Sequence, residues 1–130
     1  MQLLQEAQAR HKIFLAFTYG PADDGPAMDY ARASFLLFAR GRRSAFGYSP
    51  VCGSQPSSAR WRADIGAPLG PAAQVAGIWR REFAAGIVVV NPSSSASVSV
   101  PLGGSYVEPN GAIVTSLLLG PHTGFTLRRA

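Results

Sequence analysis

Residues 77–93 read GIWRREFAAGIVVVNPS, and this stretch decides the fold of the second half of the chain. Its two arms are rich in aromatic and β-branched residues, and the small residues Ala84-Ala85-Gly86 separate them, as is typical of two short strands joined by a tight turn. The Asn91-Pro92 pair ends the second arm, because proline has no N–H to donate to a sheet. We therefore predict a β-hairpin with strands over residues 77–83 and 86–90.

The strand pattern continues to the end of the chain. Residues 97–102, SVSVPL, alternate between polar and apolar side chains, which predicts a strand with one solvent-exposed and one buried face. Turn signals at residues 103–104 and 109–111 come before a strand over residues 113–119. A turn at residues 121–124 and a closing strand at 125–128 follow. Five or six short strands at this spacing predict a small antiparallel β-sandwich.

The first half of the chain has a different pattern. Residues 2–10 have a helix-forming composition, and the apolar run over residues 12–19 predicts a strand that is covered on both faces, as in a parallel sheet. We predict a helix over residues 26–40, capped by Gly41 in the left-handed conformation. A second short strand follows at residues 44–48. Strand, helix and strand in this order predict a βαβ unit with a right-handed crossover.

The length of the chain limits how much of a larger fold it can contain. With 130 residues it is too short for a complete (β/α)8 barrel, which typically needs about 250. A hydrophobic content of 47% with 15% charged residues indicates a folded globular protein. Residues 51–76 are rich in Ser, Gly, Pro and Ala and predict an irregular connection. We therefore divide the chain into a βαβ unit (1–50), this connection (51–76) and a β-sandwich domain (77–130).

Charge and cysteine content restrict the classes of function. The net charge of +5 comes from eleven Arg and one Lys. Because the Arg residues are scattered in pairs and form no stripe, we rank a nucleic-acid partner third among the hypotheses. The longest apolar run is far short of a membrane span, so we expect no membrane partner. The single cysteine, Cys52, excludes an internal disulfide and a Cys-based zinc site. We expect neither a metal nor another cofactor.

The N-terminal residues do not settle the localisation. The segment 1–10 is polar and lacks the basic start and apolar core of a signal peptide. We expect the protein to be either cytoplasmic or, if an upstream segment is missing from this sequence, extracellular.

Four segments together resemble the end of a glycoside hydrolase. Residues 30–39, YARASFLLFA, followed by residues 46–48, FGY, are similar to the late barrel helix and final strand of (β/α)8 glycoside hydrolases. Residues 64–70, DIGAPLG, and the hairpin at 79–93 look like the joining segment and first strands of the β-sandwich domain that follows such barrels. The resemblance spans about residues 12–129. It implies that the chain is the C-terminal part of a carbohydrate-active enzyme.

The resemblance also implies where substrate would bind. Glycosidases need two carboxylates about 5–9.5 Å apart across the sugar, and these usually lie on central barrel strands that this chain lacks. We therefore assign no catalytic residue and expect the chain alone to be inactive. The loops after the two barrel-like strands would face the active-site rim. There Tyr19 and Tyr48 could stack on sugar rings, and Asp23 and Asp24 could bind hydroxyls. The alternative is that both acids only solvate the loop and precede the helix.

The hairpin contains a second candidate for sugar binding. Trp79, Arg81 and Phe83 share one strand face, and we expect that face to pack in the core or at the barrel–sandwich interface. Arg80 and Glu82 should lie outside. The alternative is that Trp79 is an exposed platform for sugar.

Two hypotheses about function therefore stay open. The first is a C-terminal region of a glycoside-hydrolase-like protein, whose partners would be an oligo- or polysaccharide and either the missing N-terminal barrel or a second copy of the chain. The second is a stand-alone, non-catalytic β-sandwich module that binds carbohydrate or a partner domain.

Overall fold

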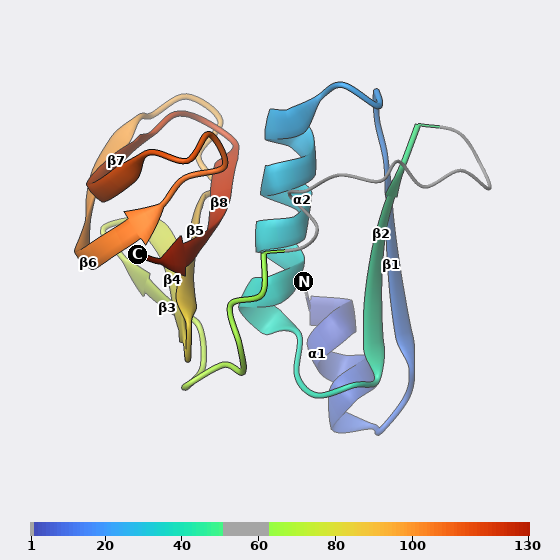
Figure 1. The fold of residues 1–130 in the computed structure, drawn as a ribbon. Coiled ribbons are helices and arrows are strands. Elements are labelled where there is room, and N and C mark those ends of the chain that lie inside the picture. The colour runs from blue at the N-terminus through green and yellow to red at the C-terminus, as the bar shows by residue number, and fades with distance from the viewer. Residues whose placement is uncertain (1, 51–62) are drawn as a thin grey trace.

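The computed structural model describes residues 2–50 and 63–130, which form three layers (Figure 1). A two-stranded parallel sheet and a six-stranded antiparallel sheet lie on opposite sides of the long helix α2. This arrangement confirms the predicted α+β class. The elements in chain order are α1 (Gln2–Ala9), β1 (Phe14–Tyr19), α2 (Gly25–Phe38), β2 (Ser44–Ser49), β3 (Ala73–Val75), β4 (Ile78–Phe83), β5 (Gly86–Asn91), β6 (Val98–Val107), β7 (Ile113–Leu119) and β8 (Thr123–Arg129).

The first half forms the predicted βαβ unit. Strands β1 and β2 pair in parallel, from Phe14 opposite Ser44 to Tyr19 opposite Ser49. Helix α2 has proline in its first turn, where a missing N–H costs nothing. It ends at Phe38, two residues earlier than predicted, because the next residue already has an extended backbone with ψ of 136°.

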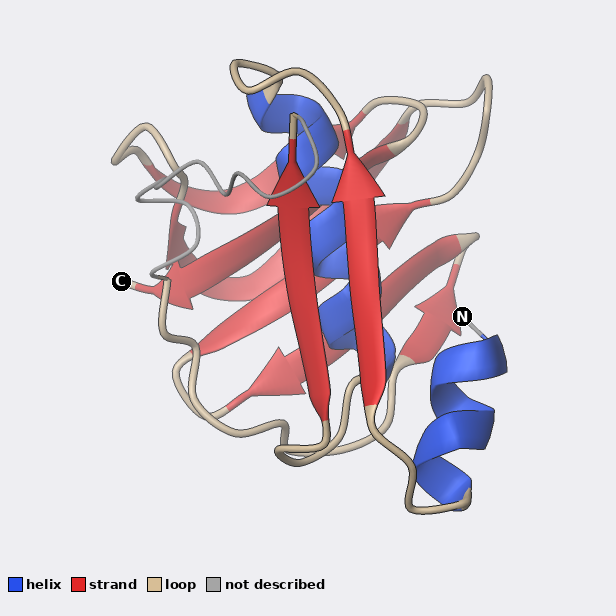
Figure 2. Ribbon diagram, turned by 90° about the vertical axis from the view of Figure 1, so that its right-hand side faces the viewer, coloured by secondary structure: helices blue, strands red, loops and turns tan. Residues whose placement is uncertain are grey.

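The prediction that the first strand is covered on both faces is wrong. Helix α2 covers one face of the β1–β2 pair, where the rings of Phe35 and Phe46 stack with their centroids 5.6 Å apart. On the other face of β1, the side chains of Leu15, Phe17 and Tyr19 are 59%, 56% and 63% exposed. Figure 2 shows the reason: the described part of the chain places a helix behind these two strands and no element in front of them.

The second half contains the predicted hairpin and strands, joined in one curled antiparallel sheet. The strand order is β3-β4-β5-β8-β6-β7, and β7 covers residues 113–119 as predicted. The pairing of β6 with β7 shifts register between Pro101 and Tyr106, and such irregularities bend a strand. The sheet thus closes like half a barrel around its own core. That core comprises Ile78, Ile87, Val89, Val100, Leu102, Tyr106, Leu117, Leu119 and Leu127.

The outer face of the curled sheet packs against α2. Phe83, Val88 and Val90 form a second core with Ala33 and Leu37 of the helix. Helix and sheet approach closely at Gly124, because a β-carbon there would lie 3.1 Å from that of Ala33. The two halves of the chain therefore share a core across α2.

Part of the predicted connection belongs to the sheet. Ala84 N–H donates to the carbonyl of Ala67 at 2.9 Å, and Ala85 N–H donates to that of Ile65 at 2.8 Å. Strand β3 then pairs with β4 at the sheet edge. The side chain of Ile65 is also buried in the core between α2 and the sheet. The sequence did not reveal this, because the few apolar residues of the connection follow no strand or helix period. Residues 51–62, including Cys52, lie outside the described residues, and our division of the chain into three regions stays a prediction.

Candidate functional site

The predicted site lies at the carboxyl ends of β1 and β2. The parallel register places Thr18 beside Tyr48 and Tyr19 beside Ser49. The loop over residues 20–24 then leads into α2. The structure thus brings the loop acids and Tyr48 to one end of the βαβ unit, as the sequence predicts, but it gives them different surroundings.

Tyr19 and Asp23 are the accessible members of the site. The Tyr19 side chain lies on the uncovered face of the parallel pair and is 63% exposed. Asp23 is also exposed, at the tip of the loop. An exposed ring and an exposed carboxylate at the same end of the βαβ unit can stack on a sugar and accept hydrogen bonds from its hydroxyls. Sugar binding by these residues stays a prediction.

Tyr48 has a structural role in this arrangement. Its ring is 1% exposed, and its hydroxyl donates a hydrogen bond to the carbonyl oxygen of Pro21 at 3.2 Å. The loop lies so close that a β-carbon at Gly20 would be 2.1 Å from the Tyr48 hydroxyl oxygen. Both faces of the ring are therefore covered, and stacking on a sugar would require the loop to move away.

Asp24 begins the helix. Its carboxylate oxygen accepts a hydrogen bond from the N–H of Ala27 at 2.9 Å, and this caps α2. Asp24 therefore has the helix-starting role that the sequence offered as the alternative to sugar binding. This capping sequence, Asp-Gly-Pro, is a signal that sequence inspection can find.

Burial and the neighbouring carboxylates of Asp24 and Asp23 raise the pKa of Tyr48 above its ordinary value of 10.0. Both effects disfavour the phenolate, because it would lose hydration and lie close to two negative charges.

This shift predicts how stability depends on pH. The unfolded chain releases the Tyr48 proton near pH 10, whereas the folded chain keeps it. The contribution of Tyr48 is therefore fully present below about pH 10 and is lost as the pH rises through the higher folded pKa. We expect Tyr48→Phe to lower the free energy of unfolding at pH 7 by about 1 kcal/mol through the lost hydrogen bond. Chemical denaturation between pH 8 and about pH 11 should show that the free energy of unfolding declines less steeply for this variant than for the wild type. An unchanged decline would contradict this assignment.

Two buried polar residues hold the fold together. Arg81 is 4% exposed and Asn91 is 1% exposed. The side-chain amide of Asn91 donates to the carbonyls of Ala96, Leu119 and Gly120, which ties the end of β5 to the end of β7. The burial of Arg81 confirms the expectation that the strand face it shares with Trp79 and Phe83 is packed inside the protein.

The structure offers no metal centre and no helical membrane span among the residues that it describes. No three His, Cys, Asp or Glu side chains in these parts of the chain group together as metal ligands would. Within residues 2–50 and 63–130, none of the helices is both long and apolar enough to cross a bilayer.

A family model described as hypothetical glycosyl hydrolase family 15 (GHL15) matches residues 2–87. The chain belongs to this family. The match runs from α1 through the βαβ unit and β4 into the beginning of β5. It confirms the resemblance to glycoside hydrolases at the level of the family. No curated protein matches the chain.

Proposed function

We propose that this GHL15 chain is the C-terminal region of a carbohydrate-active enzyme. In this proposal, β1, α2 and β2 are the last part of a (β/α)8 barrel and the curled sheet is the domain that follows it. The catalytic carboxylates are on barrel strands outside this chain. The chain itself completes the barrel wall and contributes side chains to the rim of the active site.

The uncovered face of β1 is the observation that carries the proposal. Each strand of a (β/α)8 barrel has one face toward the helices and one toward a packed interior. The β1–β2 pair has α2 on one face, while Leu15, Phe17 and Tyr19 of β1 are more than half exposed on the other. Large apolar side chains on one surface are usually covered by another part of the protein or by a partner. Further barrel strands would cover this face and pair with the outer edges of both strands.

The same geometry assigns roles at the rim. Tyr19 is the last residue of β1 and lies on the face that would point to the barrel interior. Active sites of such barrels lie at the carboxyl ends of the strands. Tyr19 and Asp23 would therefore contact substrate directly. Tyr48 and Asp24 would hold the loop that carries Asp23.

Reading the gene upstream of the Met1 codon tests the proposal. We expect an open reading frame that continues for about 200 residues with repeated strand–helix patterns and with two acids at strand ends. The chain alone should not hydrolyse aryl glycosides above background. A stop codon with a ribosome-binding site directly upstream would contradict the proposal. So would turnover by the isolated chain that Asp23→Asn abolishes and Asp64→Asn, an exposed control acid, leaves unchanged.

One observation favours the second hypothesis, a stand-alone β module. The curled sheet has a core of its own that does not include α2. At its open side, a groove of about 340 Å³ is lined mainly by apolar side chains of β3, β4 and β6, with Arg80 beside them. A module that binds carbohydrate or a partner domain through this groove would need neither β1 nor β2. Deletion of residues 1–50 would then leave ligand binding intact.

A further inference from the structure

Most of the net charge of the chain lies at one end of the molecule. Residues 2–12 and 40–43 contain five of the twelve Lys and Arg residues and one of the seven acids, so they carry +4 of the net +5. Their one acid, Glu6, already pairs with Arg10 at 2.6 Å. The two segments are 28 residues apart in the sequence. In the sequence, their arginines are therefore too far apart to be recognised as one basic surface.

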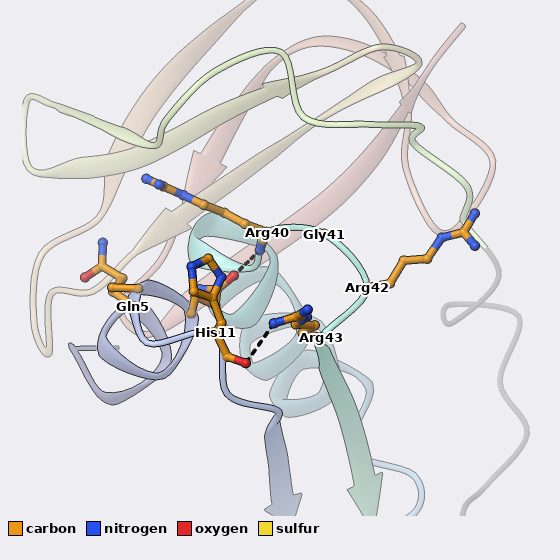
Figure 3. Close-up of a pocket in the computed structure, with 8 residues that line it drawn as sticks. Gln5, His11, Arg40, Gly41, Arg42 and Arg43 are labelled. Atoms are coloured by element: carbon orange, nitrogen blue, oxygen red, sulfur yellow. Dashed lines mark hydrogen bonds between the residues drawn. The ribbon is translucent and has the colours of Figure 1, made fainter.

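Hydrogen bonds between the two segments build a defined surface. The side chain of Gln8 on α1 donates to the carbonyl of Phe38 at 3.0 Å and accepts a hydrogen bond from the N–H of Arg40. The Arg43 guanidinium donates to the carbonyl of His11 at 2.8 Å. These contacts hold the loop before β1 against the loop before β2. They enclose a pocket of about 400 Å³, which we call the basic pocket; it is lined by Gln5, Gln8, Ala9, His11, Arg40, Gly41, Arg42 and Arg43 (Figure 3).

The arginines of the basic pocket spread rather than converge. Figure 3 shows the side chains of Arg40 and Arg42 extending in opposite directions from the loop, with Arg43 turned toward His11. Both Arg40 and Arg42 are exposed. A single small anion would be bound best by guanidinium groups that point at one place. Groups that fan out suit a longer ligand with negative charges spaced along it.

We propose that the basic pocket binds an acidic polysaccharide through its carboxylate or sulfate groups. The pocket lies at the amino ends of β1 and β2, at the opposite end of the βαβ unit from Tyr19 and Asp23. It is therefore a second site, which would hold a charged chain while another part of the same chain reaches the rim. The choice of a polysaccharide rests on the carbohydrate-active role proposed above.

The composition of the pocket supports a polysaccharide over a nucleic acid. Proteins that bind single-stranded nucleic acids commonly stack bases on aromatic side chains. No Phe, Tyr or Trp is among the described residues that line the basic pocket. The exposed amide of Gln5 lies beside the arginines and can bond to hydroxyl groups. Arginine recognises carboxylate and sulfate oxygens through paired N–H groups.

The test is a binding titration of the full chain against four polymers: polygalacturonate, dextran sulfate, neutral dextran and single-stranded DNA. We expect binding to polygalacturonate, dextran sulfate or both, weaker at higher salt because the charges are exposed, and none to neutral dextran. Binding to polygalacturonate alone assigns carboxylates, and binding to dextran sulfate alone assigns sulfate esters. Binding to neither, or tighter binding to the DNA, would overturn the proposal. The barrel-completion proposal would survive that result, because the gene sequence tests it separately.

Matched variants locate the binding surface. Arg40→Gln and Arg42→Gln should each weaken binding about fivefold, which is the effect typical of one basic residue beside an anionic surface. Arg128→Gln on β8 removes the same charge from an exposed position outside the pocket, and should change the affinity less than about twofold. Thermal melts should show that all three variants are folded. Equal losses in the three variants would mean non-specific attraction and would overturn the assignment of the pocket.

Discussion

Replacing Arg81 with glutamine should lower the free energy of unfolding by about 3–5 kcal/mol, because one buried and three partly buried carbonyl groups lose their donor together. One guanidinium nitrogen of Arg81 donates to the carbonyls of Leu36, Leu37 and Ala39, at 2.8, 3.1 and 2.7 Å. Its Nε donates to the carbonyl of Gly70 at 2.9 Å. Glutamine is too short to reach all of these groups.

The effect should be large because Arg81 joins three parts of the chain. The last carbonyls of a helix have no partner within the helix and need outside donors, and a cation there also matches the helix dipole. Arg81 lies on β4 and supplies both the hydrogen-bond donors and the positive charge to the C-terminal end of α2. Burial, and then the nearby charge of Arg40, lower the pKa of Arg81, but guanidinium remains protonated at neutral pH.

Urea denaturation followed by circular dichroism measures this loss. Arg128→Gln is the matched control, because the same substitution at an exposed position should change stability by less than about 0.5 kcal/mol. Arg81→Lys keeps the charge but provides fewer donors, so it should fall between the wild type and Arg81→Gln. A loss below about 1 kcal/mol for Arg81→Gln would show that Arg81 does not join the helix to the sheet.

Replacing Phe83 with alanine should lower the free energy of unfolding by about 3–5 kcal/mol, because the buried contacts of the ring are lost. The Phe83 ring is 4% exposed and packs in the core between α2 and the sheet. The guanidinium of Arg81 lies over the same ring, 5.4 Å from its centroid. Trp79→Ala should lower the free energy of unfolding by about 3 kcal/mol, the lower end of that range, because the Trp79 ring is only half-buried against Phe38.

Thermal melts combined with polysaccharide binding separate structure from ligand recognition. If Trp79 is structural, Trp79→Ala lowers the melting temperature, and any loss of binding follows unfolding. If the variant keeps the wild-type melting temperature but no longer binds a polysaccharide column, Trp79 is an exposed platform for sugar. The stand-alone module would then become the leading function.

Some features of the candidate site could be predicted and others could not. The sequence places Tyr19 and Tyr48 at strand ends, and the parallel register bears this out. It does not distinguish the exposed Tyr19 from the buried Tyr48, because both lie at the carboxyl end of a short strand. That difference depends on which strand face α2 covers and on the loop beginning at Gly20, which closes over Tyr48. The roles of Arg80 and Glu82 were also only partly predicted. They pair with each other at 2.6 Å, but Arg80 also reaches across the open side of the sheet to the carbonyls of Pro101 and Leu102.

The local elements of this protein follow from its amino-acid sequence alone. Hydrophobic alternation, Asn-Pro and Gly-containing turns specify the hairpin, the strands and α2, because these signals act between residues that are close in the chain. Three features depend on tertiary packing: the strands of the second half form one curled sheet, Arg81 caps a helix from the other half, and two distant basic segments form one pocket. Each of these depends on contacts between residues far apart in the sequence, where packing and backbone hydrogen bonds outweigh local preference.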